Sequence, residues 1–167
     1  MEYTSDANAG PGHAPADTPL LSALFSDLVR CETRLYNVLN DRLRERHGIV
    51  TSQYEFLAYL RAHPGCRVAD LAAEFAIGVG ATSKGVDRLA LQGWVLRRPN
   101  PGDRRSSLLD LTPAGTRLTE EAALTFTATL TPLLLPTLDP AALTATARAL
   151  ATLRAALEQT QTGTPAG

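Results

Sequence analysis

Apolar residues in this chain recur at three- and four-residue steps over long stretches, which is the spacing of one face of an α-helix. These steps join most of the apolar positions from 20 to 46. The pattern returns after Thr112 and again after Asp139, two polar residues that are each followed by proline and therefore suit the start of a helix. Pro132 or Pro136 is expected to break the first of these later helices. The pattern predicts three long amphipathic helices, one near the beginning of the chain and two near its end.

The middle of the chain contains shorter segments. Ser52 and Glu55 have the spacing of a capping box, which predicts a helix that runs to about Ala62. Next, "VADLAAEFA" and "VGATSKGVDRLALQ" predict two helices joined by the short turn "IG", the dimensions of a helix-turn-helix. "WVLRR" and "SSLLDL" then predict two strands on either side of a turn rich in proline and glycine. The residues expected to face inward in the two helices are Val68, Leu71, Ala72, Phe75, Thr82, Val86 and Leu89.

The order of these elements predicts a mainly α chain with a small β-hairpin wing, that is, a winged helix-turn-helix between long N- and C-terminal helices. The terminal helices are too apolar and too extended for so small a core to cover, so we expect them to form a homodimer. The expected divisions are a disordered tail at 1–19, an N-terminal dimerisation helix at 20–47, the winged helix-turn-helix at 48–112, C-terminal dimerisation helices at 113–158, and a second disordered tail at 159–167.

Charge is unevenly distributed along the chain, although the whole sequence has a net charge of only −1. Residues 78–105 contain six basic and two acidic side chains, a net charge of +4, whereas the other residues contain ten bases and fifteen acids, a net charge of −5. A short basic segment on an acidic protein is typical of a surface that binds a polyanion such as DNA. The sequence contains no run of eighteen apolar residues and begins without the apolar stretch of a secretory signal, so we expect no membrane span and a cytoplasmic protein.

An α-helix fits the major groove of double-stranded DNA, where residues near its N-terminus reach the base edges first. The second helix of the predicted pair presents small residues that permit a close approach, together with a hydroxyl and two cations. The turn of the wing has two arginines at its tip, which suit the minor groove, and two at its base, which suit phosphates. Its aspartate is expected to pair with a neighbouring arginine and fix the direction of that side chain. The candidate DNA-binding residues are Gly80, Ala81, Ser83, Lys84 and Arg88 in the helix, and Arg97, Arg98, Asp103, Arg104 and Arg105 in the wing.

Other candidate chemistry is sparse. Cys31 and Cys66 are too few for a metal cage, and His13, His47 and His63 do not have the spacing of metal ligands, so we expect no metal and no other cofactor. The sequence lacks a P-loop and the GxGxxG, HExxH and GxSxG motifs, and we therefore expect no enzymatic activity. A winged helix that binds only other proteins stays open as a different class of function.

The sequence resembles the MarR family of bacterial transcription regulators over about residues 48–116. "VDRL" leading to "GWV", followed by "DRR" and "LTPAG", carries this resemblance. It implies a dimeric winged helix that binds palindromic operators, most often as a repressor, and that releases them when a small-molecule effector or an oxidant arrives. It also implies that Asp103 braces Arg105. In such dimers the effector pocket lies between the long helices and the winged domain, where Tyr36, Tyr54, Tyr59 and His63 could make contacts.

The chain departs from the pattern of that family at three positions. Arg67 replaces the usual serine or threonine before the third helix, and Gly78 replaces the usual polar cap before the recognition helix. Both helix starts are therefore expected to lose a side-chain cap. Gly85 stands where the family has a bulky apolar residue, and a glycine inside a helix is expected to loosen it.

A thiol-based oxidant sensor is the alternative function within the same fold. Some members of the family place a reactive cysteine near the start of the first helix. Cys31 lies in that predicted helix, about five residues deeper, and its basic neighbours in sequence are Arg30 and Arg34.

Overall fold

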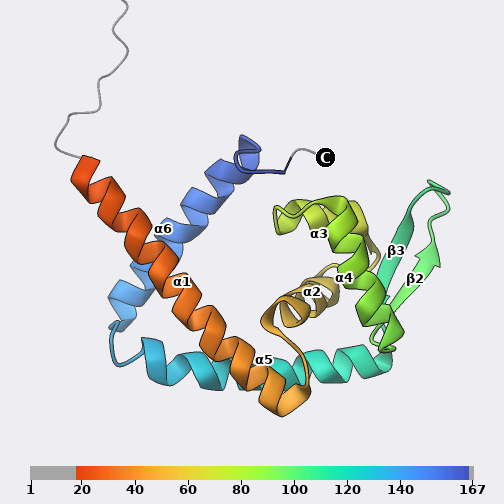
Figure 1. Cartoon of the computed structure of the whole chain (residues 1–167), viewed down its shortest axis with the longest axis horizontal. Helices are drawn as coiled ribbons and strands as arrows, with labels where there is room; N and C mark the ends of the chain where they lie inside the picture. The colour runs from red at the N-terminus through yellow and green to blue at the C-terminus, as the bar shows by residue number, and fades with distance from the viewer. Residues whose placement is uncertain (1–17, 166–167) are drawn as a thin grey trace, which may run out of the picture. The chain divides into compact units, whose positions relative to one another are not determined.

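The computed structural model describes residues 18–165, in which there are six helices and one three-stranded antiparallel sheet (Figure 1). The chain divides after Tyr36 into two compact units, and the second unit contains all elements from the end of α1 onward. The elements are α1 (Thr18–His47), α2 (Thr51–Ala62), β1 (Cys66–Arg67), α3 (Val68–Glu74), α4 (Val79–Leu91), β2 (Val95–Pro99), β3 (Ser107–Leu111), α5 (Pro113–Leu134) and α6 (Pro140–Gln159).

Local sequence explains most of the helix boundaries. The Thr112 hydroxyl accepts a hydrogen bond from the Gly115 amide at 2.9 Å, and the Asp139 carboxylate accepts one from the Ala142 amide at 2.8 Å, so both predicted N-caps are confirmed. Gly48 and Gly93, which follow α1 and α4, have φ angles of +68° and +75°. This left-handed conformation favours glycine and ends a helix.

One predicted boundary was wrong. The second helix starts at Thr51 rather than Ser52, and the side chain that caps it is Gln53, whose oxygen accepts from the Val50 amide at 2.9 Å. Glu55 lies two residues too late for that contact. Of the two prolines expected to break α5, Pro132 lies inside the helix and Pro136 follows its end at Leu134, which agrees with a break at the second of them.

The ends of the described chain differ in detail from the expected tails. Residues 1–17 and 166–167 lie outside the described residues, and Thr18 and Pro19 already belong to α1. After Gln159 the chain forms hydrogen-bonded turns, in which the Thr162 amide donates to the Leu157 carbonyl at 2.9 Å. Among residues 18–165, no helix is both long and apolar enough to cross a membrane.

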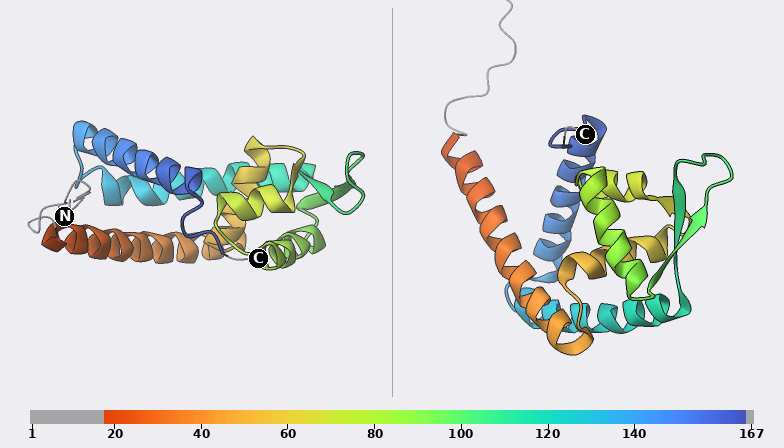
Figure 2. Two further views of the ribbon diagram at one scale, coloured as in Figure 1. Left: turned by 90° about the horizontal axis from the view of Figure 1, so that it is seen from above. Right: turned by 45° about the vertical axis from the view of Figure 1, so that its right-hand side comes forward.

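The sheet contains one strand that the sequence pattern did not predict. Its order is β1-β3-β2, with the two-residue β1 pairing through Cys66 to Leu109, and Arg97 of β2 pairing with the same leucine from the other side. A strand of two residues is too short to produce an alternating pattern in the sequence. The hairpin of β2 and β3 extends away from α2 and α3 (Figure 2).

The hydrophobic core lies in the second unit, between the helix-turn-helix, the sheet and α5. All three residues expected to face inward from α4, namely Thr82, Val86 and Leu89, are fully buried. The other helices and the sheet contribute large aliphatic side chains, so a single core fixes α4 relative to the wing. The buried apolar residues of this cluster are Leu43, Ile49, Phe56, Leu57, Leu60, Leu71, Val86, Leu89, Val95, Leu109 and Ala122.

Gly85 has a packing role in this core. A Cβ atom at this position would lie 3.0 Å from Cε2 of Phe56, which is buried beneath α4. The glycine therefore allows α4 to approach α2 closely, and the aromatic ring of Phe56 occupies the space that a larger side chain at position 85 would fill.

Candidate nucleic-acid interface

The recognition helix α4 exposes the side that the sequence predicted. Gly80, Ala81, Lys84 and Arg88 are exposed, and Ser83 is half-buried. Lys84 and Arg88 are four residues apart and so lie one turn apart on the same face. Gly78 provides no side-chain cap at the start of α4, as expected, and the Thr82 hydroxyl donates to the Gly78 carbonyl at 3.2 Å.

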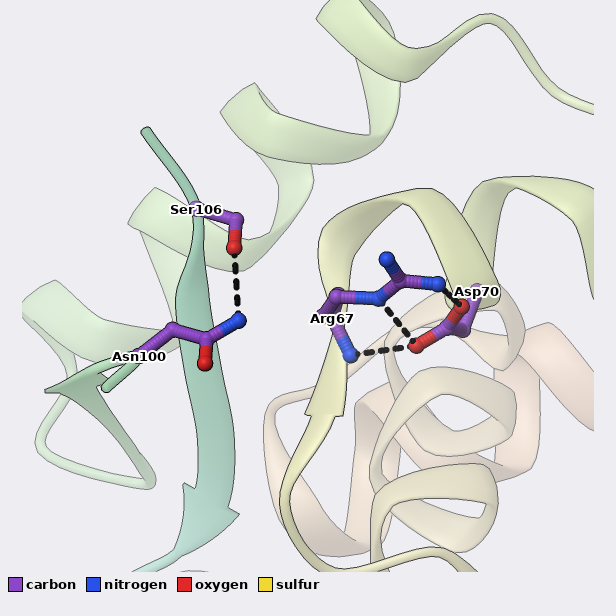
Figure 3. Close-up of polar contacts among 4 residues, drawn as sticks. All are labelled: Arg67, Asp70, Asn100 and Ser106. Atoms are coloured by element: carbon purple, nitrogen blue, oxygen red, sulfur yellow. Dashed lines mark hydrogen bonds and ion pairs between the residues drawn. The ribbon is translucent and has the colours of Figure 1, made fainter. Parts of the chain in front are cut away.

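The turn of the wing is held by side-chain hydrogen bonds within residues 100–106. Asn100 Nδ2 donates to Ser106 Oγ at 2.8 Å across the turn (Figure 3), while Asn100 Oδ1 accepts from the Gly102 amide at 3.0 Å. Asp103 Oδ1 accepts from the Arg105 amide at 2.9 Å. These contacts fix the backbone that carries the exposed side chains of Arg104 and Arg105.

The contact between Asp103 and Arg105 differs from the one that the sequence predicted. The carboxylate binds the main-chain amide of Arg105, and within the described residues no ion pair joins it to an arginine side chain. An aspartate that accepts from the amide two residues later forms an Asx turn, which orients the backbone and leaves the guanidinium free to move.

Arg97 and Arg98 are held by contacts within the protein. Arg97 lies on β2, but its Nη2 reaches Asp87 Oδ1 on α4 at 2.7 Å, and its side chain is only 28% exposed. Arg98 pairs with Asp110 of β3 at 2.5 Å and is more exposed. To bind phosphates, as the sequence predicted, both arginines would have to break or share these ion pairs.

The remaining four cations of the basic segment are exposed and form no ion pair with another described residue. Because ion pairing occupies two of the six basic side chains, the positive potential of this surface comes mainly from the other four. We call them the free cations: Lys84 and Arg88 on α4, and Arg104 and Arg105 on the wing.

Arg67, at the start of α3, has a contact that compensates for the missing cap. The Asp70 carboxylate accepts from the Arg67 amide at 2.8 Å and from its Nη2 at 2.6 Å (Figure 3). This hydrogen bond from the Arg67 side chain is the main reason why the pKa of Asp70 is lowered. An acid three residues after the cap residue thus satisfies the amide of that residue, although the residue itself is an arginine.

The thiols and histidines form no metal site among the described residues. Burial, together with the nearby carboxylates of Asp70 and Asp110, raises the pKa of Cys66 to about 11. Cys31 is exposed on α1. His47 bonds the Thr125 hydroxyl at 2.8 Å, His63 stacks on Tyr59, and His13 lies outside the described residues.

A cavity of about 510 Å³ lies between the second half of α1 and α5. Arg42 and Arg46 line it together with two threonines and several apolar side chains. The tyrosines and the histidine that were considered for an effector pocket do not line this cavity: Tyr54 stacks on Phe126, and Tyr59 packs against His63 and Phe75. The sequence missed the cavity because its wall combines residues that are about 90 positions apart. Its lining residues are Val38, Arg42, Arg46, Leu124, Thr125, Ala128, Thr129, Pro132 and Leu133.

Comparison with known proteins supports this description of the fold. The chain is similar to a mutant of MarR from Escherichia coli complexed with operator DNA, with a TM-score of 0.70 and 22% identity over 84% of this chain and 99% of that one. It is also similar to Sco3205, a MarR family transcriptional regulator from Streptomyces coelicolor in complex with DNA, with a TM-score of 0.75 and 23% identity over 90% of this chain and 93% of that one.

Sequence comparison identifies the family. The sequence profile of the MarR family matches residues 47–106. The multiple antibiotic resistance protein MarR of Salmonella typhimurium is 30% identical over 106 residues, which are 60% of this chain and 74% of that protein. The chain therefore belongs to the MarR family of winged-helix proteins, which are transcription regulators rather than enzymes.

Proposed function

We propose that this protein is a transcriptional repressor that binds an inverted-repeat operator as a homodimer. The observation that carries the proposal is the set of four free cations, which α4 and the wing expose on a protein that is otherwise acidic. Such a surface attracts DNA because neutralising phosphates releases the condensed counterions.

In the proposed complex, α4 enters the major groove. Gly80 and Ala81 add little bulk near the N-terminus of the helix, so its backbone can approach the base edges closely. Lys84 and Arg88 then reach base edges or phosphates. Arg104 and Arg105 at the tip of the wing enter the adjacent minor groove, where the negative potential favours a guanidinium.

The proposed homodimer follows from the exposure of the terminal helices. None of the 20 residues of α6 is buried, and its leucine stripe of Leu150, Leu153 and Leu157 is exposed. A helix of this kind obtains most of its stability from packing an apolar face, so a second chain is expected to cover it. At the start of α1, Leu20, Leu21, Leu24 and Phe25 are exposed in the same way, and a second chain is expected to cover them too.

The proposal is tested by DNA binding of the full-length protein and of Arg105→Glu. Wild type should prefer the upstream region of its own gene over random DNA, and its affinity should fall steeply with salt, since each phosphate contact contributes about −0.9 to the slope of log K against log salt. Arg105→Glu should lose binding and stay dimeric, as measured by fluorescence anisotropy and sedimentation. Equal binding of both DNAs by wild type would contradict a sequence-specific regulator.

We place the effector in the cavity between α1 and α5. Its volume of about 510 Å³ is within the range of small-ligand sites. Arg46 and Arg42, which also pairs with Glu45 at 2.8 Å, line this cavity beside Val38, Leu124 and Leu133. The proposed ligand class is therefore a small organic acid with an apolar body. A screen of such acids for release of the DNA complex tests this assignment.

Oxidant sensing by Cys31 is the second candidate function. Of the two cysteines, only Cys31 has an exposed thiol, whereas Cys66 is partly buried with a raised pKa. Oxidation of Cys31 would change the charge of α1 in the proposed dimer interface. If peroxide releases DNA from wild type and equally from Cys31→Ser, this candidate is rejected.

A further inference from the structure

We propose that Arg97 is a positioning residue, which fixes the wing against the recognition helix and does not itself bind DNA. The inference rests on the proposed DNA-binding function and replaces the phosphate contact that the sequence predicted for this arginine. Its basis is a network of four hydrogen bonds that connects β2, β3 and α4.

The Arg97 guanidinium bridges the wing and α4 at two points on the helix. Nη2 donates to Asp87 Oδ1 at 2.7 Å, to Ser83 Oγ at 3.2 Å and to the Ser83 carbonyl at 3.3 Å. Nη1 donates to Ser107 Oγ on the neighbouring strand at 3.0 Å. Since Ser83 and Asp87 lie one turn apart, the planar guanidinium fixes both the distance and the angle between helix and hairpin.

The same geometry makes Arg97 unsuitable as a phosphate ligand. An arginine binds phosphate with two parallel N–H groups, either Nη1 with Nη2 or Nε with Nη2. Nη2 is already shared among three acceptors, and Nε is buried without an acceptor among the described residues. Both arrangements would therefore require the network with α4 to break.

The network also accounts for an acidic side chain on the proposed DNA-binding helix. Asp87 is exposed and repels phosphates, so its own charge opposes DNA binding. Its ion pair with Arg97 holds the wing beside α4, and Lys84, Arg88, Arg104 and Arg105 then depend on that placement to contact one duplex. The acid contributes to binding indirectly, through the position of the wing.

Four variants separate positioning from phosphate contact: Arg97→Gln, Arg97→Lys, Asp87→Ala and the double variant Arg97→Gln/Asp87→Ala. Affinity is measured by anisotropy over a series of salt concentrations, with the upstream region of the gene of this protein as probe. We expect Arg97→Gln and Arg97→Lys to weaken binding on the order of tenfold, with the salt slope of wild type, because no phosphate contact is lost. Asp87→Ala should also weaken binding, although the loss of an acid would by itself strengthen it.

The double variant removes both charges and tests whether the two residues act as a pair. Positioning predicts that it binds about as weakly as either single variant, since one interaction is lost in all three. If Arg97→Gln were weak only because Asp87 became unpaired, the double variant would recover the affinity of wild type, and the proposal would be overturned.

Two controls calibrate the measurement. Arg61→Gln removes an arginine from the ion pair with Glu120, which joins α2 to α5 and involves neither α4 nor the wing, and should bind DNA like wild type. Arg105→Gln, by contrast, should reduce the slope by about one phosphate contact. An Arg97→Gln variant that shows the same reduced slope would contradict positioning.

Hydrogen exchange on the DNA-free protein gives a readout that does not depend on the proposed function. We expect Arg97→Gln to speed amide exchange in β2 and β3 while the core segment of α2 keeps its protection, which also verifies folding. Unchanged exchange in the wing would overturn the proposal. If wild type instead shows no preference for its own upstream DNA, the proposed function fails, and the exchange data still judge the contact between the wing and α4.

Discussion

At the scale of single residues, the surroundings of a side chain decide its chemistry more than its type does. Four arginines surround the wing turn in sequence, yet two of them form ion pairs inside the protein and two are free at the tip. Position along a strand explains the division for Arg97 and Arg98, which lie where Asp87 and Asp110 are within reach. The two cysteines also differ in their surroundings, since Cys31 is exposed and Cys66 is partly buried.

The cysteines provide a prediction about reactivity with pH. The pKa of Cys66 is raised to about 11, first by burial, so its thiol stays protonated and unreactive until the pH approaches that value. At pH 8, iodoacetamide should modify exposed Cys31 and leave Cys66 almost unmodified, as read by peptide mass spectrometry. Modification of Cys66 should increase as the pH is raised toward 11, and in Cys31→Ser the protein should take up almost no label at pH 8. Equal rates of modification at the two thiols at pH 8 would contradict the partly buried environment described for Cys66.

At the scale of elements, the junction between the wing and α5 depends on a close approach of two backbones. The Thr112 amide donates to the Trp94 carbonyl at 3.0 Å, and the Thr112 hydroxyl donates to the Gly93 carbonyl at 2.7 Å. Gly115 then packs directly against Trp94: a Cβ at position 115 would lie 2.0 Å from the Trp94 carbonyl oxygen. The first turn of α5 is therefore seated on the start of β2 in a way that only glycine permits.

Gly115→Ala should destabilise the protein. The added methyl group meets backbone atoms that cannot rotate away, so we expect a loss of unfolding free energy of about 3 kcal/mol, the upper end for overpacking. Gly80→Ala is the matched control, because a Cβ at position 80 meets no atom within 4 Å, and its stability should stay within about 1 kcal/mol of wild type. Denaturant unfolding measures both variants. A stability of Gly115→Ala equal to that of Gly80→Ala would contradict the described junction.

At the scale of the whole molecule, the unburied terminal helices are the main sign that the functional unit is larger than one chain. α6 has an apolar stripe and no buried residue, whereas the helix-turn-helix, the sheet and α5 share one continuous core. A regulator that binds an inverted repeat needs two winged domains at a fixed separation, which a dimer formed by the long helices would provide.

A double substitution on α6 tests this arrangement. Leu150→Glu/Leu153→Glu places two charges in the proposed interface and should shift the protein from dimer to monomer, since unpaired charges there would have to be desolvated. The monomer should lose most of its affinity for an inverted repeat. Sedimentation velocity measures the first effect and anisotropy the second. Thr144→Glu/Thr152→Glu adds the same charges at exposed polar positions on the side of α6 opposite the leucine stripe and should remain a dimer. A glutamate variant at the two leucines that stays dimeric would contradict the interface.

The sequence by itself determined the parts of this protein that depend on local periodicity and local caps. The inward residues of α4, the two strands of the wing and the caps at Thr112 and Asp139 follow from short-range spacing, and the structure agrees with each of them. The motifs from "VDRL" to "LTPAG" were sufficient to indicate the MarR family, because they combine the recognition helix, the wing and the next helix start in one segment.

Only the tertiary structure decided which charges remain free and which spaces remain open. The pairing of Arg97 with Asp87 depends on how β2 folds back onto α4, and Gly85 is explained by Phe56, which lies 29 positions earlier in the chain. Strand β1 and the cavity beside Arg42 and Arg46 likewise arise from segments that are distant in sequence. Local patterns specify backbone conformation within a few residues, whereas ion pairs and packing depend on which segments the core brings together.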